Sequence, residues 1–314
     1  MASMSETELP SWRDSSTRTS ILDFVADVTT GADTVPAEER IAVFDNDGTL
    51  WTEKPMPTQL HYVVQQWRAA VEADPELAEK QPFKAVVDGD LGWLGRAVDQ
   101  HYEGDDTDLQ TMIAGIVKVT AGLSAEEYAA SVAEFYRSSQ HLTLKRPYSS
   151  AVYQPMVELL RFLEANGFTC YIVSGGERDF MRPITEDYYG IPPERVVGSA
   201  YGLSYDEDSA RVRYAPSLAF FDDGEQKPLR IWSRIGRRPL LAVGNSNGDM
   251  QMLDFARRTP RGAALLIHHD DDARDDVPYD TGAENALSSA AERGYTVISV
   301  KDDWSTIFVD PDGS

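Results

Sequence analysis

The sequence predicts an α/β fold, in which a parallel sheet carries helices on both faces and a smaller helical domain is inserted after the first strand. Two observations predict this fold. From residue 146 to the end, short apolar runs typical of buried strands alternate with helical segments, an order typical of a parallel sheet. Between residues 54 and 145 the hydrophobic period is helical, and no alternating strand pattern occurs.

The first elements along the chain are a helix and a strand. Residues 19–30 (TSILDFVADVTT) place their apolar side chains near one stripe, which predicts an amphipathic helix. IAVF at 41–44 predicts a short buried strand. In the inserted block, residues 60–71 keep helical spacing, and residues 124–139 begin like a helix with a capping box. The insert is therefore expected to be helical throughout.

The second half of the chain supplies the remaining strands. A helix over 155–167 has Pro155 near its start and Gly167 at its end. The alternation of residues 201–216 predicts a hairpin around 206–209. A further helix is expected at 284–294. The predicted strands are 168–173, followed by a turn at 174–176, then 195–200, 239–244, 263–269 and 294–300.

These elements divide the chain into two domains. We expect an α/β core over 18–53 and 146–314, a helical domain over 54–145, and a flexible N-terminal segment over 1–17. A chain of 314 residues is long enough to bury a substantial core in such an arrangement.

Composition excludes several classes of function. The net charge of −23 opposes binding to nucleic acid and to anionic membranes. No run of 18 apolar residues occurs, so no membrane span is expected. The first residues lack the apolar core of a signal peptide, so a cytoplasmic protein is expected. Cys170 is the only cysteine, which excludes an internal disulfide. The sequence does not indicate an oligomeric state.

Polar segments follow four of the predicted strands. DNDGT follows Phe44, SGG follows Val173, GNSNGD follows Val243 and HHDDD follows Ile267. Ligands of open α/β sheets bind at the carboxyl ends of the strands. The four segments are therefore expected to meet at one edge of the sheet.

The residues of these segments suit phosphoryl transfer. Asp45 can attack phosphorus in line, while Asp47 protonates the leaving oxygen and then deprotonates the hydrolytic water. An anion that attacks an anion needs a cation, and Mg²⁺ suits carboxylate and carbonyl oxygens. Asp249 can supply a further ligand, and Ser174 can donate to the phosphoryl group. Gly48 allows a sharp turn with backbone N–H groups facing the phosphoryl oxygens.

The four segments DNDGT, SGG, DGEQKP and GNSNGD, taken in this order, resemble the motifs of the haloacid dehalogenase superfamily. The helical insert resembles the C1-type cap of its phosphoserine-phosphatase-like branch. The resemblance implies a Rossmann-like core and a helical cap domain. It also implies that Asp45 is the nucleophile, that Asp47 is the general acid/base, and that Ser174, Gly175 and Lys227 bind the phosphate.

The same resemblance implies the metal ligands. Asp45, the backbone carbonyl of Asp47 and Asp249 would hold Mg²⁺. Asn245 stands where many members of the superfamily have an acidic residue, which lowers the negative charge around the metal. Asn245 is therefore expected to bind Mg²⁺ more weakly or through a water molecule.

The tract His268, His269 and Asp270 to Asp272 suggests a transition-metal site at first sight. Adjacent side chains of a strand point to opposite faces, so the two histidines seldom bind one ion together. Zinc is therefore disfavoured, and we expect one of the histidines to line the cleft instead.

The favoured function is a Mg²⁺-dependent phosphatase that hydrolyses a small-molecule phosphomonoester through an aspartyl-phosphate on Asp45. The alternatives are a phosphomutase of the same superfamily and a non-catalytic phosphate-binding protein. A carbon–halogen dehalogenase is disfavoured because it has no use for Asp47. The sequence does not identify the substrate. Glu53 is a candidate for contact with the leaving group, but its register in the cap is not fixed by the sequence.

Overall fold

A seven-stranded sheet forms the centre of the computed structural model, which describes residues 8–90, 92–102 and 104–308. The strand order is β4-β3-β2-β1-β5-β6-β7, and all neighbours are parallel except the antiparallel pair β3 and β4. The predicted α/β fold is thereby confirmed. The strands are β1 (Ile41–Phe44), β2 (Thr169–Glu177), β3 (Val196–Asp206), β4 (Arg211–Phe220), β5 (Leu241–Gly244), β6 (Ala263–His268) and β7 (Thr296–Ser299).

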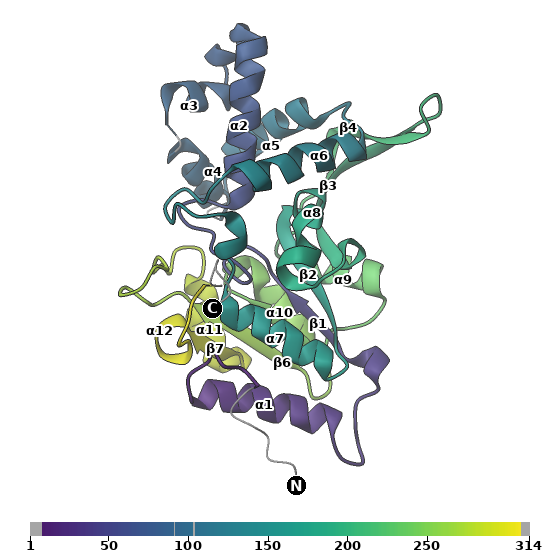
Figure 1. The fold of residues 1–314 in the computed structure, drawn as a ribbon, viewed down its shortest axis with the longest axis vertical. Coiled ribbons are helices and arrows are strands. Elements are labelled where there is room, and N and C mark those ends of the chain that lie inside the picture. The colour runs from purple at the N-terminus through teal and green to yellow at the C-terminus, as the bar shows by residue number, and fades with distance from the viewer. Residues whose placement is uncertain (1–7, 91, 103, 309–314) are drawn as a thin grey trace.

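Helices cover both faces of this sheet (Figure 1). On one face lie α1 (Ser16–Thr29), α7 (Gln154–Ala165) and α8 (Arg178–Tyr189), which share an apolar cluster with Phe44. On the other lie α9 (Gln226–Ile235), α10 (Met250–Arg257) and α11 (Glu284–Arg293), which share a cluster with Val43. The short helix α12 (Val300–Asp303) follows β7 directly. Successive side chains of β1 point to opposite faces of the sheet. Because helices cover both faces, all four residues of β1 are buried.

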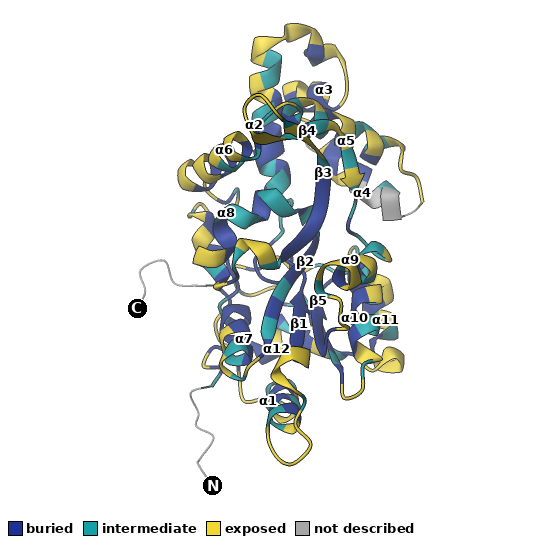
Figure 2. Ribbon diagram, turned by 90° about the vertical axis from the view of Figure 1, so that its right-hand side faces the viewer, coloured by how far each residue is buried: buried dark blue, intermediate teal, exposed yellow. Residues whose placement is uncertain are grey.

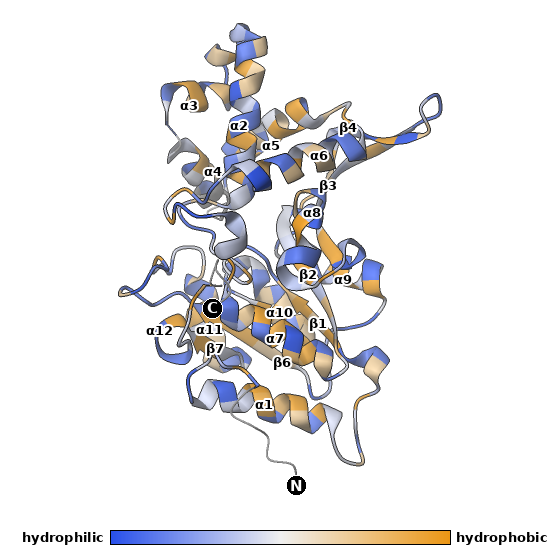
Figure 3. Cartoon of the chain, viewed as in Figure 1, coloured by the Kyte–Doolittle hydropathy of each residue, from blue (hydrophilic) through white to orange (hydrophobic). Residues whose placement is uncertain are grey.

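Burial and hydropathy follow these layers. Strands β1 and β5 are buried throughout and β2 in part, while the outer sides of the helices are exposed (Figure 2). Apolar residues concentrate in the strands and on the helix sides that meet them (Figure 3). Within the described ranges, no helix combines the length and the apolar character needed to cross a bilayer.

Between β1 and α7 in the sequence, the described residues form five α-helices, which make up the upper part of the molecule in Figure 1. They are α2 (Thr58–Ala73), α3 (Phe83–Asp88), α4 (Gly92–Tyr102), α5 (Thr107–Thr120) and α6 (Ala125–Ser138). The predicted capping box of α6 is present, since Ser124 and Glu127 each bond the backbone N–H of the other. The helical insert is thus confirmed as part of the fold, whereas the domain boundaries at 53/54 and 145/146 stay a prediction.

The β3–β4 hairpin reaches from the sheet to the helical insert. The loop between α5 and α6 pairs with β4, since Gly122 donates to the carbonyl of Tyr214 and Tyr214 donates to that of Leu123. The rings of Tyr128 and Tyr214 meet edge to face at 5.0 Å. The insert is therefore joined to the core by more than its two connecting segments.

Two strands are longer than the sequence predicts. The turn expected at 174–176 is absent, because β2 continues to Glu177 beside β3. The neighbouring strand satisfies the polar groups there, since the hydroxyl of Ser199 donates to the carbonyl of Gly175 at 2.7 Å. β3 in turn joins the strand expected at 195–200 to the first arm of the predicted hairpin.

The N-terminal segment differs from the flexible segment expected over 1–17. Residues 1–7 lie outside the described residues, but Leu9 and Trp12 are buried and α1 begins at Ser16. The indole of Trp12 meets that of Trp304 edge to face at 6.2 Å and donates to the carbonyl of Pro155. Residues 8–15 therefore pack against the core, because their few apolar side chains cover Trp304.

Candidate active site

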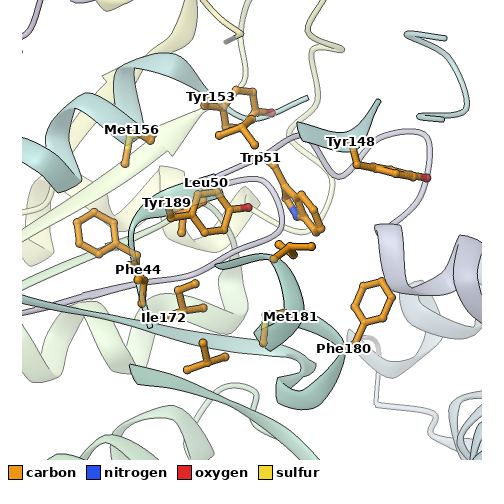
Figure 4. Packing of buried hydrophobic residues seen from close by; sticks show 14 of the residues in the cluster. Phe44, Leu50, Trp51, Tyr148, Tyr153, Met156, Ile172, Phe180, Met181 and Tyr189 are labelled. Atoms are coloured by element: carbon orange, nitrogen blue, oxygen red, sulfur yellow. The ribbon is translucent and has the colours of Figure 1, made fainter. Parts of the chain in front are cut away.

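The turn after β1 directs Asp45 and Asp47 toward a cavity. Leu50 N–H donates to the carbonyl of Asn46 at 2.8 Å, and Gly48 N–H donates to that of Trp51 at 2.9 Å. Gly48 has a φ of +73°, and a Cβ there would lie 2.1 Å from Asn245 Nδ2. Only glycine suits this position. Beyond the turn, Leu50 and Trp51 belong to the apolar core (Figure 4).

Asp45, Lys227 and Asp249 form a buried ionic cluster. Lys227 Nζ lies 3.0 Å from Asp45 Oδ1 and 2.5 Å from Asp249 Oδ1. The side chains of Lys227 and Asp249 are 2% and 0% exposed, so water hardly screens their charges. Three residues that the sequence places far apart thus meet at one point.

Asp249 is fixed by the chain that precedes it. Its Oδ2 accepts hydrogen bonds from the backbone N–H groups of Asn245 and Ser246 and from the Ser246 hydroxyl, at 2.9, 2.9 and 3.0 Å. Its other oxygen is left to face Lys227. The fixed carboxylate of Asp249 therefore holds the Lys227 ammonium between Asp249 and Asp45.

The charges of the cluster shift its acid–base equilibria. Burial and the charge of Asp249 raise the pKa of Asp45 well above its ordinary value, and Lys227 opposes them. Burial alone would lower the pKa of Lys227, but Asp249 and Asp45 raise it well above its ordinary value. Lys227 is therefore an ammonium ion held between the two acids.

Asp47 has the acidity that suits a general acid/base. Burial raises its pKa to about 7, the charge of Glu53 adds to the rise, and a hydrogen bond from Trp51 opposes it. Trp51 Nε1 donates to Asp47 Oδ1 at 2.8 Å. A group with a pKa near neutrality can give and take a proton at physiological pH.

A cavity of about 620 Å³ joins the predicted residues. Asp45, Asp47, Ser174, Gly175, Lys227 and Asn245 line it, while Asp249 lies behind Lys227. Ser174 is buried and accepts a hydrogen bond from Gly176 N–H at 3.1 Å, so its hydroxyl retains a proton to donate. The structure therefore brings the predicted set to one place, and the roles of its members stay a prediction.

Asn245 connects the ends of β1 and β5. Its Oδ1 accepts from the Thr49 hydroxyl at 3.0 Å, and its Nδ2 donates to the Tyr279 hydroxyl at 3.2 Å. The amide therefore holds the turn after β1 against the end of β5. The second lone pair of Oδ1 is still suited to a bound water or cation.

Neither histidine of the HHDDD tract lines the cavity, so that expectation was wrong. His269 is buried beneath the turn, where Nε2 lies 2.8 Å from the Gly48 carbonyl and Nδ1 lies 2.7 Å from Asp276. His268 Nε2 instead contacts Asp280 at 2.8 Å. The two rings contact different acids: His268 is the last residue of β6, and His269 follows it and pairs with Tyr279 in an isolated bridge.

The contacts of His269 with the turn after β1 favour a positively charged ring. A carbonyl and a carboxylate both accept only, so both ring nitrogens must donate and the ring is doubly protonated. Burial disfavours this charge, but the hydrogen bond to Asp276 and its charge outweigh burial and raise the pKa of His269. Tyr279 stacks on the ring at 4.7 Å.

Sequence reasoning missed Glu177, which directly follows SGG and also lines the cavity. Its side chain is buried, and Oε2 accepts from Phe180 N–H at 2.8 Å, which caps α8. Oε1 has no hydrogen-bond partner among the described residues. Burial raises the pKa of Glu177 to about 8, and the charge of Asp179 adds to the rise. The sequence feature that could have identified Glu177 is its position directly after the SGG segment.

The site contains oxygen donors of the types that bind divalent cations. Among the residues that the structure describes, no group of three or more His, Cys, Asp or Glu side chains is arranged to hold a metal. Mg²⁺ does not need such a group, since it is commonly held by one or two carboxylates and several waters. Oδ1 of Asp45 and Oδ1 of Asp249 both contact Lys227 Nζ, and Asp45 also lines the cavity, so carboxylate oxygens of the kind that Mg²⁺ prefers are present at the site.

Comparisons with solved structures support the fold. A conserved protein of unknown function from Anaerococcus prevotii DSM 20548 is 17% identical, with a TM-score of 0.58 over 94% of each chain. A protein of unknown function from Bordetella pertussis Tohama I is 18% identical, with a TM-score of 0.53 over 83% of this chain and 98% of that one. No curated protein matches the sequence.

The comparison with protein families is more specific. The model of the haloacid dehalogenase-like hydrolases matches residues 42–254, which include the turn after β1, the helical insert and GNSNGD. This match covers more than half of the chain, and the α/β sheet with its insert agrees with it. The chain therefore belongs to the family of haloacid dehalogenase-like hydrolases.

Proposed function

We propose that the protein is a Mg²⁺-dependent phosphatase that hydrolyses a small-molecule phosphomonoester through an aspartyl-phosphate on Asp45. One observation carries the proposal. Asp45 faces the cavity beside the Lys227 ammonium, and Asp47, with a pKa of about 7, lies two residues further along the same turn. We also propose that the protein acts in the cytoplasm and binds neither nucleic acid nor membranes.

The first half-reaction forms the covalent intermediate. An oxygen of Asp45 attacks phosphorus and forms a new P–O bond, while the bond from phosphorus to the leaving oxygen breaks. Asp47 in its protonated state gives its proton to this oxygen, so that an alcohol departs. Ser174, the backbone N–H of Gly175 and Lys227 bind the phosphoryl oxygens.

The second half-reaction regenerates the enzyme. Asp47, now a carboxylate, takes a proton from a water that attacks the phosphorus of the aspartyl-phosphate. The bond between phosphorus and Asp45 breaks, which frees inorganic phosphate and restores both acids. Mg²⁺ held by Asp45, the Asp47 carbonyl and Asp249, with Asn245 acting through a water, would neutralise charge on the phosphoryl oxygens.

A panel of phosphomonoesters that includes p-nitrophenyl phosphate tests this function. We expect phosphate release that EDTA abolishes and added Mg²⁺ restores, with Asp45→Asn inactive as the matched control. Product analysis separates free phosphate from the isomerised phosphoester that a mutase would form. Full activity in metal-free buffer would contradict the role of Mg²⁺, and failure to release phosphate from every ester would contradict the proposal itself.

A further inference from the structure

We propose that the cavity contains an apolar subsite for the leaving group, so that the substrate is the phosphomonoester of an apolar or aromatic alcohol. This inference rests on the proposed phosphatase function. The subsite consists of apolar side chains from α2, α5 and β4, namely Leu60, Leu109, Met112, Ile113, Ile116 and Leu218.

The subsite is continuous with the reacting groups. Asp45 and Lys227 line the same cavity as Ile113 and Ile116, with a total volume of about 620 Å³. Cavities of this size bind ligands that are much larger than a phosphate ion. A phosphoryl group beside Asp45 would occupy the polar end, and the rest of the substrate would extend into the space bounded by α5.

Helix α5 turns one apolar face toward this space. Leu109, Met112, Ile113 and Ile116 have the spacing i, i+3, i+4 and i+7, which places them on one side of a helix. Leu109 and Met112 are buried, whereas Ile113 and Ile116 are half-exposed and line the cavity. Two isoleucines that face a cavity above a reactive centre are suited to contact a ligand.

The position of α5 is fixed by close packing on its other side. A Cβ at Gly115 would lie 2.3 Å from Pro82 Cγ and 3.2 Å from a ring carbon of Trp67. The helix therefore lies directly against the segment before α3 and against α2, and a side chain larger than glycine would displace it. This contact is one of those that position α5, and with it the isoleucines, at the cavity.

The charged residues of the cavity disfavour a second anionic group on the substrate. Beyond Asp45 and Asp47, four acidic residues line the wall, namely Glu53, Glu177, Asp223 and Glu284. The cations that line it are Lys227, which is paired with Asp45 and Asp249, and Lys54, whose Nζ lies 4.0 Å over the ring of Tyr279. Lys54 Nζ also lies 3.8 Å from Glu53 Oε1, so both lysines already contact acids, and a carboxylate or second phosphate on the leaving group would have to compete for them. A neutral apolar group has no need of a cation.

A series of n-alkyl monophosphates from methyl to hexyl, assayed with Mg²⁺ present, tests the subsite. Burial of each methylene is expected to raise kcat/KM about fourfold until the cavity is filled. Phosphoserine and glycerol phosphate should react more slowly than the hexyl ester. The wild-type series needs no variant, so it tests the proposal even if a substitution impairs folding.

Two substitutions on α5 locate the effect. Ile113→Asn should flatten the dependence on chain length and lower kcat/KM for the hexyl ester by about tenfold, with little change for methyl phosphate. Ala114→Asn, on the exposed side of the same helix, should keep the wild-type dependence. Thermal unfolding of both variants checks that they are folded.

The outcomes separate this inference from the proposed function. A kcat/KM that stays flat or falls with chain length, while polar esters react well, would overturn the apolar subsite and leave the phosphatase intact. The same length dependence in Ile113→Asn as in the wild type would also overturn it. Failure to hydrolyse any phosphomonoester would contradict the proposed function, and the subsite assignment would fall with it.

Discussion

At the scale of single residues, Lys227 has a structural role beside its proposed role in phosphate binding. Its ammonium lies between the buried carboxylates of Asp45 and Asp249. Lys227→Met leaves those charges without their partner, so the free energy of unfolding should fall by about 3–5 kcal/mol in urea titrations at pH 7. Lys84→Met is the matched control, because Lys84 pairs with Asp88 on the exposed surface and its loss should change the free energy of unfolding far less. Equal losses in both variants would contradict this role.

His269 makes a second prediction at this scale, which concerns pH. Its pKa is raised in the folded state, so its contribution to stability is fully present below the ordinary pKa of 6.5. That contribution is lost as the pH rises through the raised value, because the folded protein then releases the proton. The difference in unfolding free energy between wild type and His269→Gln should therefore shrink from pH 6 to pH 9.

The partner of His269 supplies the control for this experiment. Asp276→Asn removes the charge that raises the pKa of His269, so substitution of His269 in that background should have a weaker dependence on pH. A difference that grows with rising pH, or that is the same at every pH, would show that the ring is neutral in the folded protein.

Residues whose chemistry is specific could be predicted from the sequence, and residues that depend on packing could not. Asp45 and Asp47 have no ordinary reason to follow a buried strand together, so their type and spacing identified the reacting end. Ile113 has many ordinary reasons to lie on an amphipathic helix. The packing of α5 against its neighbours, including Gly115 against Pro82 and Trp67, decides that this face of the helix meets the cavity.

At the scale of secondary-structure elements, the segment before α1 is expected to stabilise the core. Trp12 is 4% exposed and covers Trp304. Trp12→Ala should lower the free energy of unfolding by about 3–5 kcal/mol, which chemical denaturation can measure. Asp14→Ala, two residues away and exposed, should change it by less than about 0.5 kcal/mol. A negligible effect of Trp12→Ala would mean that the segment does not contribute to stability.

The central strands could be predicted at this scale because they are short apolar runs with polar residues after them. β1 agrees with the predicted range of 41–44. The ends of β2 and β3 could not be predicted, because serine and glycine in SGG favour a turn locally, whereas pairing between Ser174 and Gly198 extends the strand. Tertiary contacts therefore outweigh local preference at the edge that carries the site.

At the scale of the whole molecule, the parallel sheet brings distant segments together. β1, β2 and β5 are adjacent in the sheet, so the segments that follow them meet at one edge although they are up to about 200 residues apart in the chain. The fourth polar segment, after β6, lies behind this edge, and His269 supports the turn from there. The topology of the sheet therefore allowed the position of Asp45 and Asp47 to be predicted. The cavity wall formed by α2 and α5 of the insert could not be predicted in the same way.

The central claim is that Asp45 is the nucleophile and Asp47 the proton donor and base. Asp47→Asn keeps the nucleophile but cannot activate water. With p-nitrophenyl phosphate the leaving group needs no proton, so the first step should proceed and the second should fail. This variant should therefore accumulate a phosphoryl group.

The most direct measurement is mass spectrometry of the intact Asp47→Asn protein and of its peptides, after brief incubation with p-nitrophenyl phosphate and Mg²⁺. We predict a hydroxylamine-labile phosphoryl group on Asp45, and none on Asp45→Asn treated in the same way. A phosphoryl group on Ser174, on position 47 or on a histidine would contradict the account. So would normal turnover by Asp45→Asn, once its mass has excluded deamidation back to aspartate.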